Sequence, residues 1–386
     1  MRIGILSASP RAYSTKRIKE AAKARGHKVK VLNYLSFSIS VAQNQPWLYV
    51  GEERLKRYDA VIPRIGASVS QFGTTVVRQF EQMGVFTLNT SHAISVARDK
   101  LCTIQILSRH GIDIPRSACL FDKESIMPTL NLLGGAPVII KLLQGTQGVG
   151  VILAESSKSA EAIVETLQVT QQNVLMQHFV AESRGRDIRA FVIGDRVVAA
   201  MRRIAQGDEF RSNIHRGGLT EPVTLSKEYE QAAIKATQIV GLHVAGVDIL
   251  EANDGPKIME VNASPGLEGI EGATNVDIAT EIIKYLEEQV AFPYFDIGER
   301  LSISRGFGIF EIPVTKSSVL AKKTLEQLDL FSQGIQILCI IRGDLAIPNP
   351  DEDETVLAGD VLLCYGEKIA VKELLPQRLK RLSKTA

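Results

Sequence analysis

Cysteine is scarce in this chain, and its scarcity excludes two classes of protein. Four cysteines occur among 386 residues, and Cys102, Cys119, Cys339 and Cys364 form no close pairs along the sequence. Structural zinc sites use closely spaced cysteine or histidine pairs, and disulfide scaffolds have a far higher cysteine density. We therefore expect neither, and the simplest location for the protein is a reducing cytoplasm.

The chain also lacks an excess of charge of either sign, and it has no long apolar runs. Lysine and arginine total 45 against 43 aspartate and glutamate, a formal net charge of +2. A dedicated nucleic-acid binder is strongly basic, so we expect no direct nucleic-acid partner. No stretch approaches the roughly 20 apolar residues of a membrane span, so no membrane partner is expected. The start, MRIGILSASPR, turns polar at once and predicts a buried strand, not a signal peptide.

The composition is that of an ordinary globular protein, with 45% hydrophobic and 23% charged residues. The length exceeds what one hydrophobic core usually serves, so two or three domains are expected. Residues 1–95 alternate strand-like and helix-like segments, which predicts a small doubly wound α/β domain. One helical stretch is expected from Ser91 to the stop at Gly111.

Residues 96–290 predict a second α/β body with subdomains at 96–175 and 176–290. The second subdomain is rich in hairpins, one of them turning at Gly194-Asp195, and it ends in an amphipathic helix near 277–290. A linker follows, and residues 306–386 predict a small, β-rich domain. The expected fold class is therefore mixed α/β.

The strongest local signal is a predicted hairpin around Asp254. Asp248 and Glu260 lie six residues on either side of that centre and should face one another, with Asn262 on the same face. Two carboxylates and an amide oxygen suit Mg²⁺, which binds a few carboxylates together with substrate phosphates. From spacing alone, an ordinary solvent-exposed hairpin face explains the pattern equally well.

Two further features are compatible with phosphate binding. The loop GTQGVG at 145–150 joins two strands, so it lacks the context of a Rossmann or P-loop motif, yet its glycines allow backbone N–H groups to approach a phosphate. A plain glycine-rich turn is the alternative. Lys141 lies inside the apolar strand PVIIKLL, where an ammonium needs an anion; a snorkelling edge-strand lysine is the alternative.

Basic residues gather in the 176–290 subdomain. They could neutralise a triphosphate and an acyl-phosphate, or form a solvated face. His215, among them, receives no proton-transfer role. The arginines are Arg189, Arg202, Arg203, Arg211 and Arg216.

Taken in order, the motifs resemble those of RimK-type ATP-grasp ligases, a family that adds glutamate to the C-terminal tail of a ribosomal small-subunit protein. The resemblance covers roughly residues 1–290 and implies an ATP-grasp fold preceded by a pre-ATP-grasp α/β domain. The motifs are ARDK at 97–100, IIKLLQGTQGVGV at 139–151, QHFV at 177–180, GRDIRAFVIGD at 185–195, FRSNIHRGG at 210–218, AGVDIL at 245–250 and MEVNASPGLEGIE at 259–271.

The resemblance also implies roles for individual residues. Lys100 and Lys141 match lysines that hold ATP phosphates, and Asp187 matches an acid on the ribose side. Arg203 and Arg211 are the expected catalytic cations, and Arg189 is expected near the nucleotide. The backbone of Gln177, His178, Phe179 and Val180 matches the adenine hinge; Arg211, Ser212 and Asn213 match a nucleotide-contacting segment; and Asp248, Glu260 and Asn262 match ligands of Mg²⁺ or Mn²⁺, with two ions expected.

Two features depart from that pattern. RimK-type hinges often carry Glu where this chain has His178, which is tolerable if main-chain groups hold the adenine. Residues from about 306 onward resemble the TrkA-C module, which pairs with itself and in some members binds cyclic dinucleotides. A homo-oligomer is therefore expected, with a cyclic dinucleotide as a candidate ligand of the module and passive dimerisation as the alternative.

The expected reaction is ATP-dependent ligation of L-glutamate to a ribosomal protein's C-terminal tail through an acyl-phosphate, releasing ADP and phosphate. Two alternatives remain open. One is an ATP-grasp ligase for a small amino-acid or peptide substrate. The other is a non-catalytic regulator that senses nucleotide and acts through the TrkA-C module.

Overall fold

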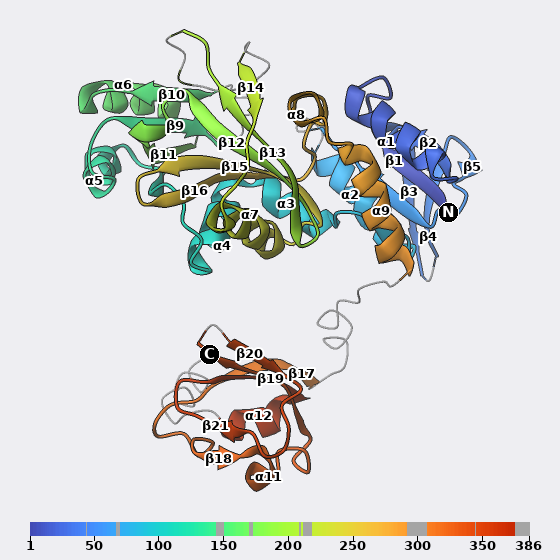
Figure 1. Ribbon diagram of the computed structural model, residues 1–386, viewed down its shortest axis with the longest axis vertical. Helices are drawn as coiled ribbons and strands as arrows, with labels where there is room; N and C mark the ends of the chain where they lie inside the picture. The colour runs from blue at the N-terminus through green and yellow to red at the C-terminus, as the bar shows by residue number, and fades with distance from the viewer. Residues whose placement is uncertain are drawn as a thin grey trace. The chain divides into compact units, whose positions relative to one another are not determined.

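The computed structural model describes residues 1–43, 45–66, 70–143, 150–169, 173–207, 210, 218–291, 307–343 and 345–374. The chain divides into two compact units, Met1–Pro293 and Tyr294–Ala386. The first unit is built on three main sheets and one small sheet, and the second unit is a small domain with its own core (Figure 1). The expected mixed α/β class is confirmed.

The N-terminal part of the first unit is a parallel sheet in the order β2-β1-β6-β7. One face packs on α1, where Ile3 and Ile5 share a core with Ile18, and the other packs on α2, where Leu6 shares a core with Val77. This is the doubly wound arrangement that the sequence predicts. The elements are β1 (Arg2–Leu6), α1 (Tyr13–Ala24), β2 (Lys28–Leu32), β6 (Ala60–Pro63), α2 (Ser70–Gln82) and β7 (Phe86–Thr87).

A small antiparallel sheet, β3-β4-β5, lies between β2 and β6 in the chain and was not foreseen. It is formed by β3 (Phe37–Ala42), β4 (Gln45–Val50) and β5 (Glu53–Arg54), after the short 3₁₀ turn η1 (Tyr34–Ser36). Gln79 of α2 fixes this sheet to the domain, because its side-chain amide donates to the carbonyls of Ser40 and Trp47.

The single helix expected from Ser91 to Gly111 is in fact two helices, α3 (Ser91–Arg98) and α4 (Lys100–Arg109). Asp99 has extended backbone angles, and its carboxylate accepts a hydrogen bond from the N–H of Cys102 at 2.9 Å. Aspartate favours such N-cap positions, so it starts a new helix instead of continuing the old one. As a result Lys100 stands at the first position of α4.

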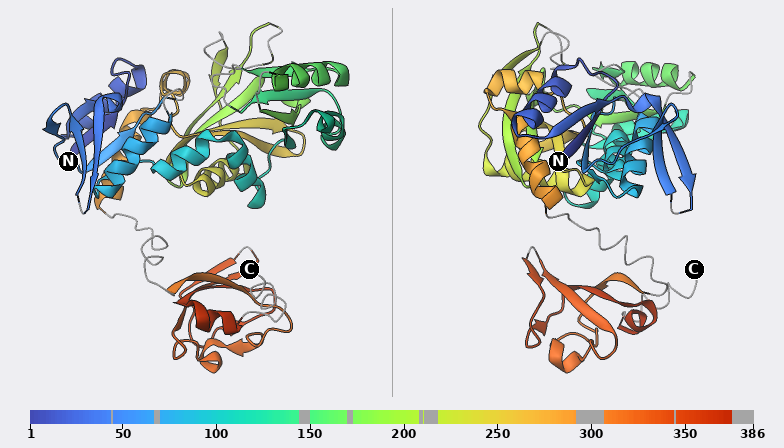
Figure 2. Two further views of the ribbon diagram at one scale, coloured as in Figure 1. Left: turned by 180° about the vertical axis from the view of Figure 1, so that it is seen from behind. Right: turned by 90° about the vertical axis from the view of Figure 1, so that its right-hand side faces the viewer.

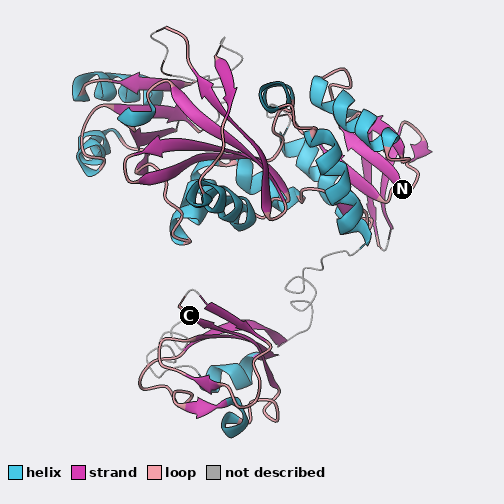
Figure 3. Cartoon of the chain, in the orientation of Figure 1, coloured by secondary structure: helices cyan, strands magenta, loops and turns pink. Residues whose placement is uncertain are grey.

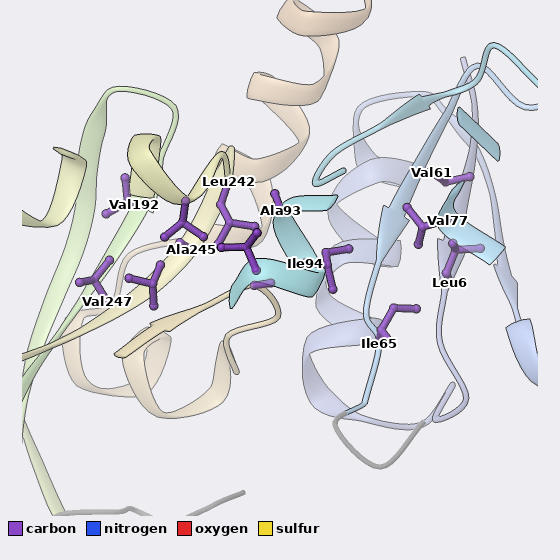
Figure 4. Packing of buried hydrophobic residues seen from close by; sticks show 14 of the residues in the cluster. Leu6, Val61, Ile65, Val77, Ala93, Ile94, Val192, Leu242, Ala245 and Val247 are labelled. Atoms are coloured by element: carbon purple, nitrogen blue, oxygen red, sulfur yellow. The ribbon is translucent and has the colours of Figure 1, made fainter. Parts of the chain in front are cut away.

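Helix α3 also joins the N-terminal sheet and the third sheet of this unit into one core. Figure 4 shows Ala93 and Ile94 of α3 between Val61 of the N-terminal sheet and Val247 of the third sheet. All four side chains are buried in one hydrophobic cluster. The two sheets are therefore held at a defined separation by apolar packing.

The second sheet is antiparallel, in the order β10-β9-β11-β8, and α5 and α6 pack on it. Its last strand, β11, runs past the expected subdomain boundary at 175 and pairs with both β8 and β9. The elements are β8 (Ser117–Leu120), η3 (Lys123–Ser125), α5 (Ile126–Leu132), β9 (Val138–Leu142), β10 (Val151–Ala154), α6 (Ser157–Val169) and β11 (Val174–His178).

The third sheet is antiparallel, in the order β14-β13-β12-β15-β16. The predicted hairpin at Gly194-Asp195 is confirmed, since Ile193 pairs with Arg196. Helix α9 packs back against α1, as the rotated views of Figure 2 show. The elements are η4 (Ala181–Ser183), β12 (Arg186–Ile193), β13 (Arg196–Ile204), β14 (Leu219–Pro222), α7 (Lys227–Val240), β15 (Val244–Ala252), β16 (Gly255–Asn262), α8 (Glu268–Thr274) and α9 (Ile278–Ala291).

The C-terminal unit consists mostly of strands and loops (Figure 3). Its main sheet is antiparallel in the order β17-β22-β19-β20, with a second pair, β18-β21. Arg342 on β19 pairs with Asp360 at 2.9 Å and Glu354 at 3.1 Å. The elements are β17 (Phe307–Pro313), β18 (Lys323–Thr324), α11 (Leu325–Leu328), β19 (Ile335–Arg342), β20 (Leu345–Pro348), β21 (Thr355–Val356), β22 (Val361–Glu367) and α12 (Lys368–Leu374).

Candidate functional site

The hairpin of β15 and β16 brings together the three predicted metal ligands Asp248, Glu260 and Asn262, called the ligand trio below. Asp248 pairs with Glu260, and Gly246 pairs with Asn262. The turn of the hairpin is Asn253-Asp254, so its centre lies half a residue before the predicted centre at Asp254. A bulge between Asp248 and Ile249 shifts the pairing by one residue and places Glu260 opposite Asp248. Without that bulge Met259 would face Asp248, because the register near the turn pairs Ile249 with Ile258.

Asp248 is buried, with 3% of its surface exposed, and two arginines neutralise it. Arg189 donates to both carboxylate oxygens at 2.7 Å, and Arg203 reaches Oδ2 at 2.8 Å. Burial alone would raise the pKa of Asp248, but the charges of Arg189 and Arg203 outweigh burial and hold the pKa at about 2. Asp248 is thus ionised at neutral pH.

Asp187 faces Arg203 across the β12-β13 pair. Both side chains are buried, and the Arg203 guanidinium donates to both oxygens of Asp187. Burial would lower the pKa of Arg203, but the charges of Asp248 and Asp187 raise it. The ribose-side role of Asp187 and the catalytic role of Arg203 stay predictions; in this structure the two form one buried network with Asp248.

The side chains of Glu260 and Asn262 are more accessible to solvent than that of Asp248. The Asn262 amide donates to Glu260 Oε1 at 3.2 Å, and both side chains are half-buried. Among the described residues, Glu260 has no cation within ion-pair distance, and no group of three or more His, Cys, Asp or Glu side chains forms a metal site. Two carboxylates and an amide oxygen fit a cation that takes its other ligands from phosphates.

Lys141 points from β9 toward this corner. Its ammonium donates to Gln177 Oε1 at 2.7 Å, and Gln177 in turn donates to Ser117 Oγ at 2.8 Å. Burial lowers the pKa of Lys141 to about 8, while the negative charge of Glu260 acts in the opposite direction. Ser117, which orients Gln177, was missed by the sequence analysis, and only its β8 position opposite Gln177 could have indicated it.

Lys100 lies close to the same corner. Its ammonium donates to the carbonyl of Leu143 at 3.3 Å, next to the glycine-rich loop. Burial lowers the pKa of Lys100, and the charge of Glu260 opposes that shift. The structure therefore brings both predicted phosphate-binding lysines within the electrostatic influence of Glu260.

The predicted adenine hinge leaves the sheet where β11 ends. The N–H of His178 is bound by the carbonyl of Arg116 at 2.8 Å, and the Val180 carbonyl accepts from Ser183 at 3.2 Å. Within the described part of the chain, the backbone of Phe179 and the N–H of Val180 form no hydrogen bond, so both are available to an adenine. The His178 ring is exposed and lies 3.3 Å from the carbonyl of Leu133.

Several predicted site residues lie outside the described part of the chain. They are Arg211, Ser212, Asn213, His215 and Arg216, together with Gly145 and Gly148 of the loop. Gly150, at the loop's end, has a φ of +75°, and a side chain there would approach Leu142 Cδ1 to 2.7 Å. Glycine is required at that position on both counts.

The fold and the gathered residues define an ATP-grasp ligase, an ATP-dependent enzyme that releases ADP. Residues 1–94 match the RimK PreATP-grasp domain and residues 97–286 match the RimK-like ATP-grasp domain. The chain belongs to the RimK family. Residues 309–377 match the TrkA-C domain, as the sequence predicts.

Curated relatives agree with this family. A protein of Rhodopirellula baltica named "Probable alpha-L-glutamate ligase" is 56% identical over 99% of this chain and 94% of its own length. A protein of Vibrio vulnificus (strain YJ016) with the same name is 51% identical, covering 75% of this chain and 96% of its own length. The second relative therefore matches without most of the C-terminal unit.

Solved structures share the fold of the first unit. The ATP-grasp ligase PsnB, complexed with a phosphomimetic variant of its minimal precursor, Mg and ADP, superposes with a TM-score of 0.59 at 25% identity, covering 75% of this chain and 98% of PsnB. D-Alanine–D-alanine ligase from Bacillus anthracis, complexed with ATP, gives a TM-score of 0.55 at 16% identity, covering 75% and 97%. The latter likeness shows the fold alone.

The structure also bears on the few cysteines and on the lack of long apolar runs. All four cysteines are free thiols. Among the described helices, none has both the length and the apolar character needed to cross a bilayer.

Proposed function

We propose that this enzyme adds L-glutamate to the C-terminal glutamate of a ribosomal small-subunit protein. The observation that carries the proposal is the corner formed by Asp248, Glu260 and Asn262 beside Lys100 and Lys141. The corner supplies oxygen ligands on one side and ammonium groups on the other, as a triphosphate requires. The names of the curated relatives support glutamate as the amine substrate.

The proposed reaction has two steps. A carboxylate oxygen of the acceptor attacks the γ-phosphorus of ATP, a carbon–oxygen–phosphorus linkage forms, and ADP leaves. The amine of glutamate then attacks the acyl carbon, gives up a proton and displaces phosphate. No nucleophile from the protein is required, so catalysis would come from positioning and charge neutralisation.

The residues of this chain divide those tasks. Lys100 and Lys141 would bind phosphate oxygens, and the backbone after β11 would hold the adenine. Glu260, Asn262 and Asp248 would hold Mg²⁺ or Mn²⁺, whose charge would offset the charge that develops on the phosphates. Arg203 is proposed as a catalytic cation and Arg189 as a phosphate neighbour, although both now hold Asp248. Arg211, Ser212 and Asn213 remain proposed nucleotide contacts.

The test is a mass-spectrometric assay of the full-length protein with ATP, Mg²⁺, L-glutamate and purified ribosomal small-subunit proteins. We expect one protein to gain mass in steps of one glutamyl residue, with matching ADP release. Glu260→Gln should reduce the gain at a limiting Mg²⁺ concentration, while a matched change at an exposed helical residue, Glu288→Gln on α9, should not. ADP release that needs only small molecules would refute the protein acceptor.

Four other expectations from the sequence also remain proposals. They are cytoplasmic location, two metal ions, a homo-oligomer, and a cyclic dinucleotide at the TrkA-C domain. If the Asp248→Ala, Glu260→Ala double variant kept full biological function, the non-catalytic regulator would replace the ligase as the better explanation.

A further inference from the structure

The N-terminal sheet has a point at which its strand order reverses. The chain goes from β1 outward to β2, and then returns to place β6 on the other side of β1. Open α/β sheets bind ligands at the carboxyl ends of the strands that flank such a point. Here those ends are Leu6 of β1 and Pro63 of β6. Arg64 follows directly, and its N–H donates to the carbonyl of Leu6 at 2.9 Å.

A second arginine reaches the same place from another element. Arg98 is the last residue of α3, and its guanidinium donates to the carbonyl of Ile65 at 2.6 Å. Its Nε is buried and has no hydrogen-bond partner among the described residues. Burial, reinforced by the charge of Arg98, lowers the pKa of Arg64 to about 10. Both arginines are thus placed at the switch point, and their charges act on one another there.

These two arginines differ from the other shielded arginines of the described chain. Seven arginines there are buried or half-buried, and five have a carboxylate within 4 Å. Arg64 and Arg98 are the two without one. A shielded cation without a counter-charge is costly, so the pair calls for an anion. The paired arginines are Arg17, Arg189, Arg202, Arg203 and Arg342.

The anion must be one that the reaction places near the metal corner. Burial lowers the pKa of Arg98, and the charge of Glu260 opposes that effect, so Arg98 lies within electrostatic reach of Glu260. Lys100 and Lys141 already account for the phosphates. A glutamate unit carries carboxylates that do not react, and planar guanidinium groups bind carboxylates in a bidentate manner.

We infer that Arg64 and Arg98 bind a non-reacting carboxylate of a glutamate substrate and thereby select an acidic residue. The inference rests on the proposed function. The glutamate is either the incoming free amino acid or the terminal residue of the acceptor, and the two sources share this chemistry. Both arginines are substrate-binding residues that the sequence analysis left without a role.

The test replaces each arginine in the full-length enzyme. Arg64→Gln is the cleaner change, because the Arg64 side chain holds no hydrogen bond within the described structure. Arg98→Gln also loses the bond to Ile65, so thermal unfolding is measured alongside. Arg64→Lys keeps the charge, and Arg78→Gln, exposed on α2, is the matched control.

The readouts are the KM values for L-glutamate and for the acceptor, with ADP affinity measured separately. Removing one charged partner of a carboxylate should raise one of the two KM values roughly 10- to 100-fold, with ADP affinity unchanged. Arg64→Lys should recover part of the loss and Arg78→Gln should have no effect. The KM that rises identifies the source of the glutamate.

Amide analogues provide a second test. The wild-type enzyme should discriminate against the donor or acceptor amide that lacks the held carboxylate, and Arg64→Gln should lose that discrimination. Unchanged KM values for both substrates, or an equal loss of ADP affinity, would overturn the inference while leaving the proposed function intact. A wild-type enzyme that adds no glutamate would overturn both.

Discussion

The shifted pKa of Lys141 gives the sharpest prediction, because it links proton binding to nucleotide binding. Burial lowers the pKa of Lys141 to about 8. Only the charged ammonium attracts phosphate, and a bound phosphate returns the pKa toward its ordinary value near 10.4. About nine in ten Lys141 side chains are neutral at pH 9, against about one in ten at pH 7.

The affinity for MgADP should therefore fall about tenfold between pH 7 and pH 9. The direction follows from the sign of the shift: the binding-competent charge is present below pH 8 and is lost as the pH rises through 8. Binding at pH 9 should take up about 0.9 proton, and binding at pH 7 about 0.1. The lowered pKa of Lys100 would add to the same trend.

Isothermal titration calorimetry in buffers of different ionisation enthalpy measures both quantities. Lys141→Met should bind MgADP more weakly and lose most of the pH dependence, because methionine replaces the aliphatic part of the side chain and removes the ammonium. Lys158→Met, exposed on α6, is the matched control and should behave as wild type. A pH-independent affinity in wild type, or a dependence that survives in Lys141→Met, would refute the reasoning.

Four further predictions follow from the site and the domain structure. Glu260→Gln should raise the Mg²⁺ concentration needed for half-maximal activity with little change in stability. Asp248→Asn should cost about 3–5 kcal/mol in urea unfolding, because it leaves the half-buried Arg189 without its carboxylate partner. His178→Ala should change the KM for ATP less than about threefold if the hinge acts through its backbone, and a larger change would assign a role to the ring. A chain ending at Ala291 should keep ligase activity, since the C-terminal unit has a separate core; loss of activity at an unchanged melting temperature would contradict this.

Local patterns were sufficient to predict most of the elements that carry the fold. The alternation of strands and helices up to residue 95 predicted the doubly wound sheet, and the hairpin at Gly194-Asp195 formed as its turn chemistry indicates. The break at Asp99 was missed because helical periodicity continues across it, while the capping side chain that ends one helix and starts the next is a single-residue signal.

The ligand trio was predicted correctly partly by coincidence, because a bulge compensates for an error in the predicted centre of the hairpin. The prediction centred the hairpin on Asp254, but the turn lies at Asn253-Asp254, and a two-residue turn alone would pair Asp248 with Met259. The bulge supplies the missing residue and returns Glu260 to the face of Asp248. Spacing can indicate that two acids are equidistant from a turn, but it does not reveal a bulge, which depends on the packing of both strands.

The pairing of Arg189 and Arg203 with Asp248 could not be predicted from the sequence, and the reason is physical. Arg189 and Arg203 were expected near phosphates, and in the structure they bind Asp248 through three short contacts. A carboxylate accepts about four hydrogen bonds, so Asp248 retains roughly one free acceptor direction. Among the described residues, Glu260 contacts only the amide of Asn262, which makes it the more available first ligand for an ion. A metal ion that took a ligand from Asp248 would require one arginine to give up part of its contact, and that guanidinium would then be available to a phosphate oxygen. The same arginines can therefore neutralise Asp248 and also serve the nucleotide, and a sequence motif alone cannot separate those two roles.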